Sequence, residues 1–145
     1  FKPLSKNSIN VDMVVQNISA NGKETDLTFT IKTEDLNKTK KTIQENKDIN
    51  YRKLIFDKGV SKISIIGVGM ITTPGVTFRM FQTLANKKIN IQVISTSEIK
   101  ISVLIDKKNT KKALEALHKE FKLDKQKWVL DRLEILKDAR QKKLM

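Results

Sequence analysis

The sequence repeats itself at a spacing of 80 residues, and this repeat constrains the fold more than any other feature. Shifting the chain by 80 residues brings Phe1 onto Phe81 and Asn10 onto Asn90. A repeat at this spacing predicts two copies of one small fold. At this shift INVDMVVQNIS (9–19) lies over INIQVISTSEI (89–99), and both copies then go on to a strand-like run, DLTFTI (26–31) and EIKISVLI (98–105).

The second copy gives the order of elements most clearly. KISIIGVG (62–69) is rich in β-branched residues and predicts a buried strand. Thr73-Pro74 predicts a helix start, with Thr as the N-cap and Pro at the first helical position. Further strands are predicted over 89–96 and 100–106, and Asn109 is predicted to cap a second helix. The apolar stripes of the two helices are Val76, Met80, Phe81 and Leu84, and Ala113, Leu114, Leu117 and Phe121.

This order, completed by one more strand, is the βαββαβ plan of a ferredoxin-like fold. Because Phe1 matches a residue midway through the first helix of the second copy, the first copy is expected to lack its first strand and about half of that helix. Its predicted elements are a helix remnant (1–8), strands at 11–19 and 25–31, a helix opened by Thr33-Glu34-Asp35, and a closing strand (52–58).

The sequence therefore predicts an α+β chain of two ferredoxin-like domains and a tail. The first domain is assigned to residues 1–60 and is incomplete, the second is assigned to 61–123, and 124–145 match neither copy. In the tail Val129, Leu133 and Leu136 keep a helical spacing, which predicts an amphipathic helix of unknown role.

Composition excludes several classes of protein. The absence of cysteine excludes a disulfide scaffold, a thiol nucleophile and a Cys-type zinc site. No stretch approaches the roughly 20 apolar residues of a membrane-spanning helix. The first ten residues contain no apolar signal-peptide core, so a cytoplasmic location is expected.

The net charge of +13 raises the alternative of a basic ferredoxin-like module that binds nucleic acid. The charge comes from 25 lysines spread along the chain and only four arginines, a pattern that a general Lys/Ile/Asn bias also produces. Residues 89–106 contain no aromatic side chain on which bases could stack. We therefore expect no nucleic-acid partner and no membrane partner.

Catalytic chemistry has little support in the sequence. Gly67-Val68-Gly69 opens like a dinucleotide fingerprint, but its sixth position is Thr72, and a glycine turn between strand and helix explains it equally well. The single histidine, His118, is expected on a helix surface. No Ser/His/Asp set, carboxylate pair or metal-ligand cluster stands out, so no catalytic or metal-binding residue is predicted.

A binding function has more support. In both copies the strand after the first helix carries small polar residues, where a purely structural strand would carry more Val and Ile. Amides and hydroxyls beside backbone N–H groups suit a ligand that carries both an ammonium and a carboxylate group. The N-terminus of the helix at Thr73-Pro74-Gly75 would favour the carboxylate. The alternative is that these residues only pair with neighbouring strands and loops. They are Gln16, Asn17 and Ser19 in the first copy, and Asn90, Ser95, Thr96, Ser97 and Glu98 in the second.

These segments resemble the tandem ACT domains of the aspartokinase regulatory region. The second copy carries GVGM, PGV, IN(I/V), ISTSEIKISV and ALHxxF, and the first carries QNIS and TDLTFT. The resemblance covers residues 1–123 and does not extend to the family's kinase domain, so the ATP and magnesium that serve that domain are not expected to bind this chain. Because the kinase domain lies outside the chain, no kinase activity is expected from it alone.

The resemblance implies an allosteric role in lysine, threonine and methionine biosynthesis. Aspartokinases phosphorylate aspartate, and their ACT domains sense lysine or threonine for feedback inhibition. It further implies a homodimer through the ACT domains, with the effector at ACT–ACT interfaces, and an aspartokinase catalytic domain or subunit as a partner. The implied effector-site residues are Gln16, Asn17, Ser19, Thr77, Asn90, Ile91, Ser97 and Glu98.

Overall fold

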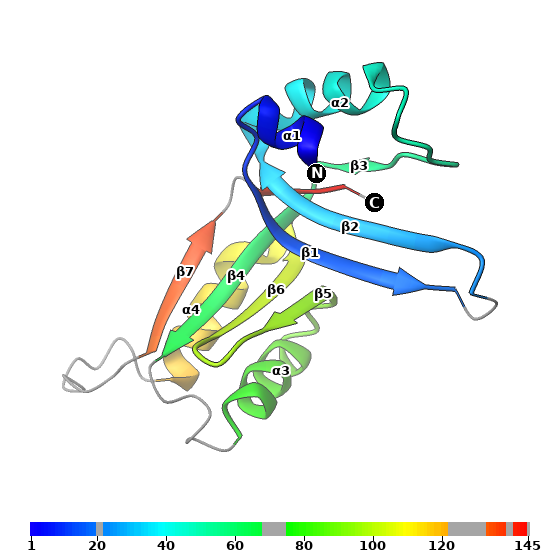
Figure 1. Ribbon diagram of the computed structural model, residues 1–145. Helices are drawn as coiled ribbons and strands as arrows, with labels where there is room; N and C mark the ends of the chain where they lie inside the picture. Colours follow the sequence, from blue (N-terminus) through cyan, green and yellow to red (C-terminus); the bar gives the residue numbers. More distant parts are fainter. Residues whose placement is uncertain (20–21, 68–74, 122–132, 139–140, 145) are drawn as a thin grey trace. The chain divides into compact units, whose positions relative to one another are not determined.

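The computed structural model describes residues 1–19, 22–67, 75–121, 133–138 and 141–144, the last two ranges as backbone. The chain divides into two compact units, which are described separately (Figure 1). Unit 1 comprises Phe1–Lys58 and Arg140–Met145, and unit 2 comprises Gly59–Ala139.

Unit 1 contains helices and an antiparallel sheet. The sheet order is β1-β2-β8-β3, so the last strand of the chain lies between β2 and β3. Its elements are α1 (Lys2–Lys6), β1 (Val11–Ile18), β2 (Thr25–Lys32), the 3-10 turn η1 (Thr33–Asp35), α2 (Leu36–Glu45), β3 (Phe56–Asp57) and β8 (Gln141–Leu144).

The core of unit 1 forms where both helices pack on the alternate residues of β2. Phe29 and Ile31 of β2 are buried together with Leu4 of α1 and with Leu36 and Ile43 of α2. Phe29 and Ile31 share one face of the strand, and the intervening Thr30 is buried as well. The predicted strands at 11–19 and 25–31 are confirmed, whereas the closing strand predicted over 52–58 is reduced to Phe56–Asp57.

Unit 2 runs in the order βαββαβ, as the ferredoxin-like plan predicts. Its antiparallel sheet has the order β5-β6-β4-β7. The elements are β4 (Val60–Gly67), α3 (Val76–Asn86), β5 (Ile91–Thr96), β6 (Lys100–Asp106), the 3-10 turn η3 (Lys107–Asn109), α4 (Thr110–Glu120) and β7 (Leu133–Asp138).

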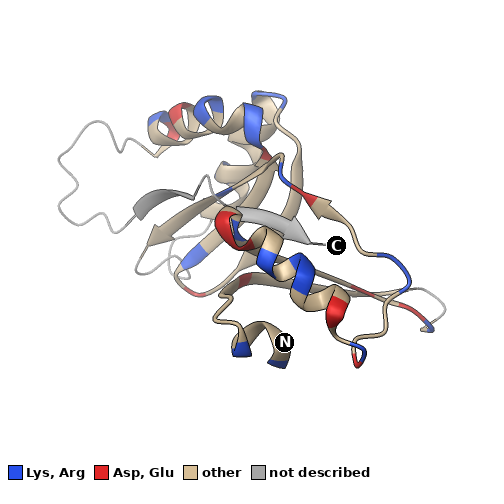
Figure 2. Cartoon of the chain, turned by 90° about the horizontal axis from the view of Figure 1, so that it is seen from above, with Lys and Arg blue, Asp and Glu red and all other residues tan. Residues whose placement is uncertain are grey.

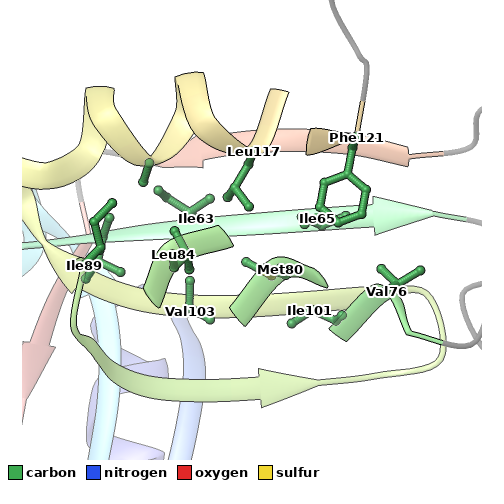
Figure 3. Packing of buried hydrophobic residues seen from close by; sticks show 12 residues of the cluster. Ile63, Ile65, Val76, Met80, Leu84, Ile89, Ile101, Val103, Leu117 and Phe121 are labelled. Atoms are coloured by element: carbon green, nitrogen blue, oxygen red, sulfur yellow. The ribbon is translucent and has the colours of Figure 1, made fainter. Parts of the chain in front are cut away.

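The core of unit 2 lies between one face of this sheet and the two helices (Figure 3). Met80 and Leu84 of α3 and Leu117 of α4 are completely buried against Ile63 and Val103 of the central strands. The helical stripes predicted from the sequence are confirmed, because every one of their residues belongs to this cluster or packs against it.

Polar side chains on the unit 2 strands are buried in pairs. The Oγ atoms of Ser64 and Ser102 lie 2.7 Å apart on neighbouring strands. The hydroxyls of Ser61 and of Thr110, at the start of α4, lie 2.8 Å apart, within hydrogen-bond distance. Each of these four buried hydroxyls therefore has a partner, which removes most of the cost of burying it.

The C-terminal tail corrects the sequence prediction. A helix was expected over 124–145, but residues 133–138 and 141–144 form β7 and β8. β7 pairs with β4 from Leu133↔Gly67 to Asp138↔Lys62. The β4 edge would otherwise present its backbone N–H and C=O groups without strand partners, and forming this ladder outweighs the local helical spacing. Val129 lies outside the described residues.

The two helix starts predicted in unit 2 have different outcomes. Helix α3 begins at Val76, with Gly75 as its N-cap at φ 88°, whereas the predicted cap at Thr73-Pro74 lies outside the described residues. Asn109 is the N-cap of α4, but its side chain makes no capping hydrogen bond. Next to Asn109, the Thr110 hydroxyl donates to Lys107 O of the preceding 3-10 turn at 2.6 Å.

Candidate functional site

The candidate binding residues are organised around the two edge strands β1 and β5. Each edge strand is the first strand of an antiparallel hairpin, paired with β2 or with β6. Val14 of β1 and Ile94 of β5 occupy equivalent repeat positions, and each is 45% exposed. Edge strands that expose apolar side chains and backbone groups favour pairing with a further strand.

Both edge strands are irregular at the same repeat position. The register of β1 shifts between Val11 and Val14, and that of β5 shifts between Ile91 and Val93. Asn10 and Asn90 are the exposed residues just before these two strands. A bulge redirects backbone groups and side chains locally, and bulges are frequent beside binding sites.

The two bulges differ in how their backbone is satisfied. In β1 the Met13 amide donates to Thr30 Oγ1 at 2.9 Å. In β5 the equivalent residue is Val93, which lies opposite Leu104, and leucine has no hydroxyl to accept this bond. The two copies therefore offer a ligand different hydrogen-bonding surroundings.

The first-copy candidates lie at the far end of β1. Gln16 and Asn17 are exposed and lie opposite Leu27 and Asp26. Ser19 closes the hairpin, because its N–H donates to Glu24 O at 2.9 Å and its Oγ accepts from the Glu24 amide at 3.0 Å. Ser19 thus has a structural role in the turn, whereas the amides of Gln16 and Asn17 face solvent.

The second-copy candidates fall into two groups at opposite ends of β5. Asn90 and Ile91 lie at its start, and Ser97 and Glu98 lie just beyond its end. At about 3.3 Å per residue this strand separates the two groups by about 20 Å. Like Ser19, Ser97 closes its hairpin, with its N–H donating to Lys100 O at 2.7 Å.

Thr77 lies exposed in the first turn of α3, beside Phe78, whose side chain is 67% exposed. Because Asn90 lies before β5 and Ser97 and Glu98 lie beyond its end, the structure does not bring these three residues of unit 2 into one cluster.

Two hollows are found in unit 1, and neither is lined by a predicted effector residue. One, of about 650 Å³, lies between α1 and α2 and is lined by four lysines among other residues. The other, of about 270 Å³, is lined by Phe1, Asn10, Val11 and Val14 among others. Asn10 is thus a candidate that the sequence analysis missed, although the 80-residue repeat already aligned it with Asn90.

The described residues give little support for functions other than amino-acid binding. His, Asp and Glu form no group of three or more there that could hold a metal ion. His118 is exposed on α4. Figure 2 shows Lys and Arg interleaved with Asp and Glu along the helices and loops. Within the described part of the chain, no helix is long and apolar enough to cross a membrane.

Comparison with known proteins identifies the family. Residues 63–121 match the model of the ACT domain. A solved structure of aspartokinase alpha and beta subunits is 41% identical, with a TM-score of 0.74, over 83% of this chain and 79% of that one. The ligand-free regulatory subunit of aspartate kinase from Thermus thermophilus is 32% identical, with a TM-score of 0.75, over 83% and 80%.

The chain matches only part of the length of its curated relatives. The aspartokinase of Bacillus sp. (strain MGA3) is 41% identical over 124 residues, which are 85% of this chain and 30% of that protein. The chain thus spans about 30% of the length of the curated aspartokinases that it matches. The chain belongs to the aspartokinase family and corresponds to its ACT-domain regulatory region.

Proposed function

We propose that this chain is the amino-acid-sensing part of an aspartokinase, and that lysine, threonine or both bind at interfaces between its ACT domains to inhibit aspartate phosphorylation. The observation that carries the proposal is the repeated edge-strand bulge beside Asn10 and Asn90. A free amino acid presents an ammonium, a carboxylate and a side chain. An amide side chain next to redirected backbone groups offers both donors and acceptors for these groups.

A second copy of the chain is the proposed partner at these edges. Ile18, Val14 and Ile94 are 69%, 45% and 45% exposed on the edge strands. Pairing β1 or β5 with the equivalent strand of another copy would cover these side chains and extend the sheets. A symmetric dimer uses the same patch on both copies, so each effector contact would occur twice.

Regulation then follows from linkage between the two sites. An effector that binds one interface geometry more tightly than another shifts the population toward that geometry. Inhibition of a catalytic domain requires that this domain also distinguishes the two geometries, because coupling is reciprocal. The partner that fits this role is an aspartokinase catalytic domain or subunit.

Calorimetry of the purified chain against single amino acids tests effector binding. Lysine or threonine is expected to bind more tightly than alanine, because a site built for a polar side chain is left with unpaired groups by an apolar analogue. Gln16→Ala and Asn90→Ala should each weaken binding by about 1–3 kcal/mol, the cost of leaving a buried partner unsatisfied. Asn37→Ala removes an exposed amide on α2 and is the matched control.

Equal heats for all three amino acids, or Gln16→Ala and Asn90→Ala that both behave like Asn37→Ala, would refute amino-acid sensing at these edges. Dimerisation is tested separately by sedimentation of the full chain and of a Val14→Asp, Ile94→Asp double variant. A monomer–dimer equilibrium that the double variant shifts toward monomer supports the proposed interface. An unchanged equilibrium contradicts it.

The regulatory role itself is tested with a separately expressed aspartokinase catalytic domain. Adding the chain is expected to make aspartyl phosphate formation sensitive to the effector. Thr77→Ala should weaken this inhibition while it leaves the uninhibited rate nearly unchanged, because Thr77 is an exposed residue at the start of α3. Inhibition that Thr77→Ala leaves unaltered would remove Thr77 from the coupling.

A further inference from the structure

The smaller hollow of unit 1, of about 270 Å³, lies between α1 and the start of β1. Leu4, Ile9, Val11 and Val14 give it a mostly apolar wall, and none of its lining residues has a charged side chain. Asn10, the exposed residue just before β1, also lines it. The hollow therefore joins an apolar surface to an amide side chain and to the backbone redirected by the β1 bulge.

The turn that brings Asn10 to the hollow is present in both copies. Ser8 has a left-handed backbone with φ 53°, and Lys88, its equivalent in the repeat, has φ 55°. Residues with a side chain rarely adopt this conformation. In each copy the turn is followed by a buried isoleucine, Ile9 or Ile89, and then by an exposed asparagine. The backbone plan is thus shared, and the side chains around it distinguish the two copies.

The side chains at this place are smaller in unit 1 than in unit 2. The repeat sets Val11 against Ile91 and Val14 against Ile94, so unit 2 has one more methylene group at each position. Both valines line the hollow. Because the backbone plan is the same, the shorter side chains leave more room beside the asparagine of unit 1 than beside that of unit 2.

The wall favours a small apolar occupant. Val14 is 45% exposed, and covering it would remove apolar surface from water. The ammonium group of a lysine side chain would find no carboxylate among the lining residues, and an unpaired charge is costly to bury. The volume lies just below the range of about 300–1,000 Å³ that drug-sized ligands occupy, which suits a ligand as small as a free amino acid.

We propose that the hollow beside Asn10 binds a free amino acid with an apolar side chain, such as leucine, as a second effector of the chain. The ligand side chain would lie against Leu4, Ile9 and Val14, and the Asn10 amide with the bulged backbone would hold the ammonium and carboxylate groups. This inference rests on the amino-acid sensing proposed above and adds a ligand class to it. Two classes of amino acid would then act on one regulatory region.

Calorimetry of the full 145-residue chain with leucine tests the inference. Leucine is expected to bind saturably, and asparagine, which has nearly the same shape but a polar side chain, should bind about tenfold more weakly. Asn10→Ala should lower the affinity for leucine about tenfold, because the charged groups of the ligand lose a partner. Asn37→Ala removes an exposed amide on α2 and should leave this affinity nearly unchanged.

A second variant reduces the hollow itself. Val11→Ile together with Val14→Ile copies the side chains of unit 2 and should lower the affinity for leucine about tenfold or more, the effect of a methylene group in an apolar pocket. Val15→Ile is the matched control, since Val15 pairs with Thr28 and lies on the other face of β1. It adds the same methylene group outside the hollow and should leave the affinity nearly unchanged.

Binding of lysine or threonine without binding of leucine would overturn this inference and leave amino-acid sensing standing. No binding of any of these amino acids would refute the sensing itself, and this inference with it. Leucine binding that Val11→Ile with Val14→Ile leaves unchanged, or asparagine that binds as tightly as leucine, would also overturn the inference. A double variant that alters the monomer–dimer equilibrium of a chain that does not bind leucine would show instead that a second copy fills the hollow.

Discussion

Arg79 on α3 contacts the C-terminal end of α4, and its replacement measures how much these contacts stabilise unit 2. Its Nε donates to Glu120 Oε1 at 2.9 Å, and its Nη2 donates to the backbone carbonyl of Glu120, also at 2.9 Å. The guanidinium carbon lies 4.8 Å from the ring centroid of Phe121. One side chain on α3 thus makes three contacts with the end of α4.

The magnitude follows from the exposure of these groups. The side chains of Arg79 and Glu120 are 46% and 39% exposed, so solvent screens the ion pair to about 0.2–1 kcal/mol. The cation–π contact with Phe121 adds about 0.5–1 kcal/mol, because the Arg79 side chain is itself half exposed, and the bond to the carbonyl adds about 0.5–1.5 kcal/mol. Because these terms share one side chain and are not additive, Arg79→Ala should cost about 1–2 kcal/mol.

Urea unfolding monitored by circular dichroism, with hydrogen exchange to assign the loss to unit 2, measures this cost. Arg79→Lys should recover less than half of the stability, because an ammonium cannot make the planar two-point contact. Glu120→Gln should lose only the ion-pair share, and about 1 M salt should reduce the difference between it and the natural chain. An Arg79→Ala chain as stable as the natural one, or a fully restored Arg79→Lys chain, would refute the reasoning.

Two further predictions concern buried hydroxyls. Thr30→Val should destabilise unit 1 by about 1–3 kcal/mol, because it leaves the Met13 amide without its acceptor. Thr30→Ser should restore most of this loss, and equal stability of the Val and Ser variants in urea unfolding would contradict the prediction. Ser64→Ala should leave the buried hydroxyl of Ser102 without its hydrogen-bond partner. A double-mutant cycle with Ser102→Ala should therefore give a coupling free energy of about 0.5–3 kcal/mol. Strict additivity of the two single changes would rule the pair out as a stabilising contact.

The sequence predicted the local elements well because each is encoded by its own periodicity. Ile101, Val103 and Ile105 alternate along the strand predicted over 100–106 and all three lie in the core, and the predicted stripe of α3 places Met80 and Leu84 there as well. These patterns depend only on neighbours within a few residues. The repeat then gave the order of the elements and the α+β class of both units.

The C-terminal strands could not be predicted in this way. β8 pairs with strands that precede it by about a hundred residues, and nothing in the local pattern of QKKL specifies those partners. In β7, LEILKD satisfies a helical spacing as readily as a strand, and the open edge of β4 decides between them. Tertiary pairing overrides local spacing in both cases.

The candidate site also has some features that the local sequence indicates and others that depend on distant residues. Gln16 and Asn90 are exposed, as their polar side chains alone lead one to expect, so the sequence could indicate their exposure. The bulges beside Asn10 and Asn90 could not be predicted, because a register shift depends on both strands of a ladder. The repeat aligned Asn10 with Asn90, but only the bulges gave that alignment a functional meaning.

The spacing of the candidates along β5 separates two roles in the proposed regulation. Asn90 and Ser97 lie at opposite ends of this strand, about 20 Å apart, which is farther than one free amino acid can reach. One bound effector therefore cannot contact both residues of the same copy. Asn90, at the bulge, is placed to change the affinity for the effector. Ser97 lies in the hairpin that joins β5 to β6, and its Oγ donates to the Lys100 carbonyl at 3.4 Å, so replacing this hydroxyl would alter the turn and, through it, the coupling free energy.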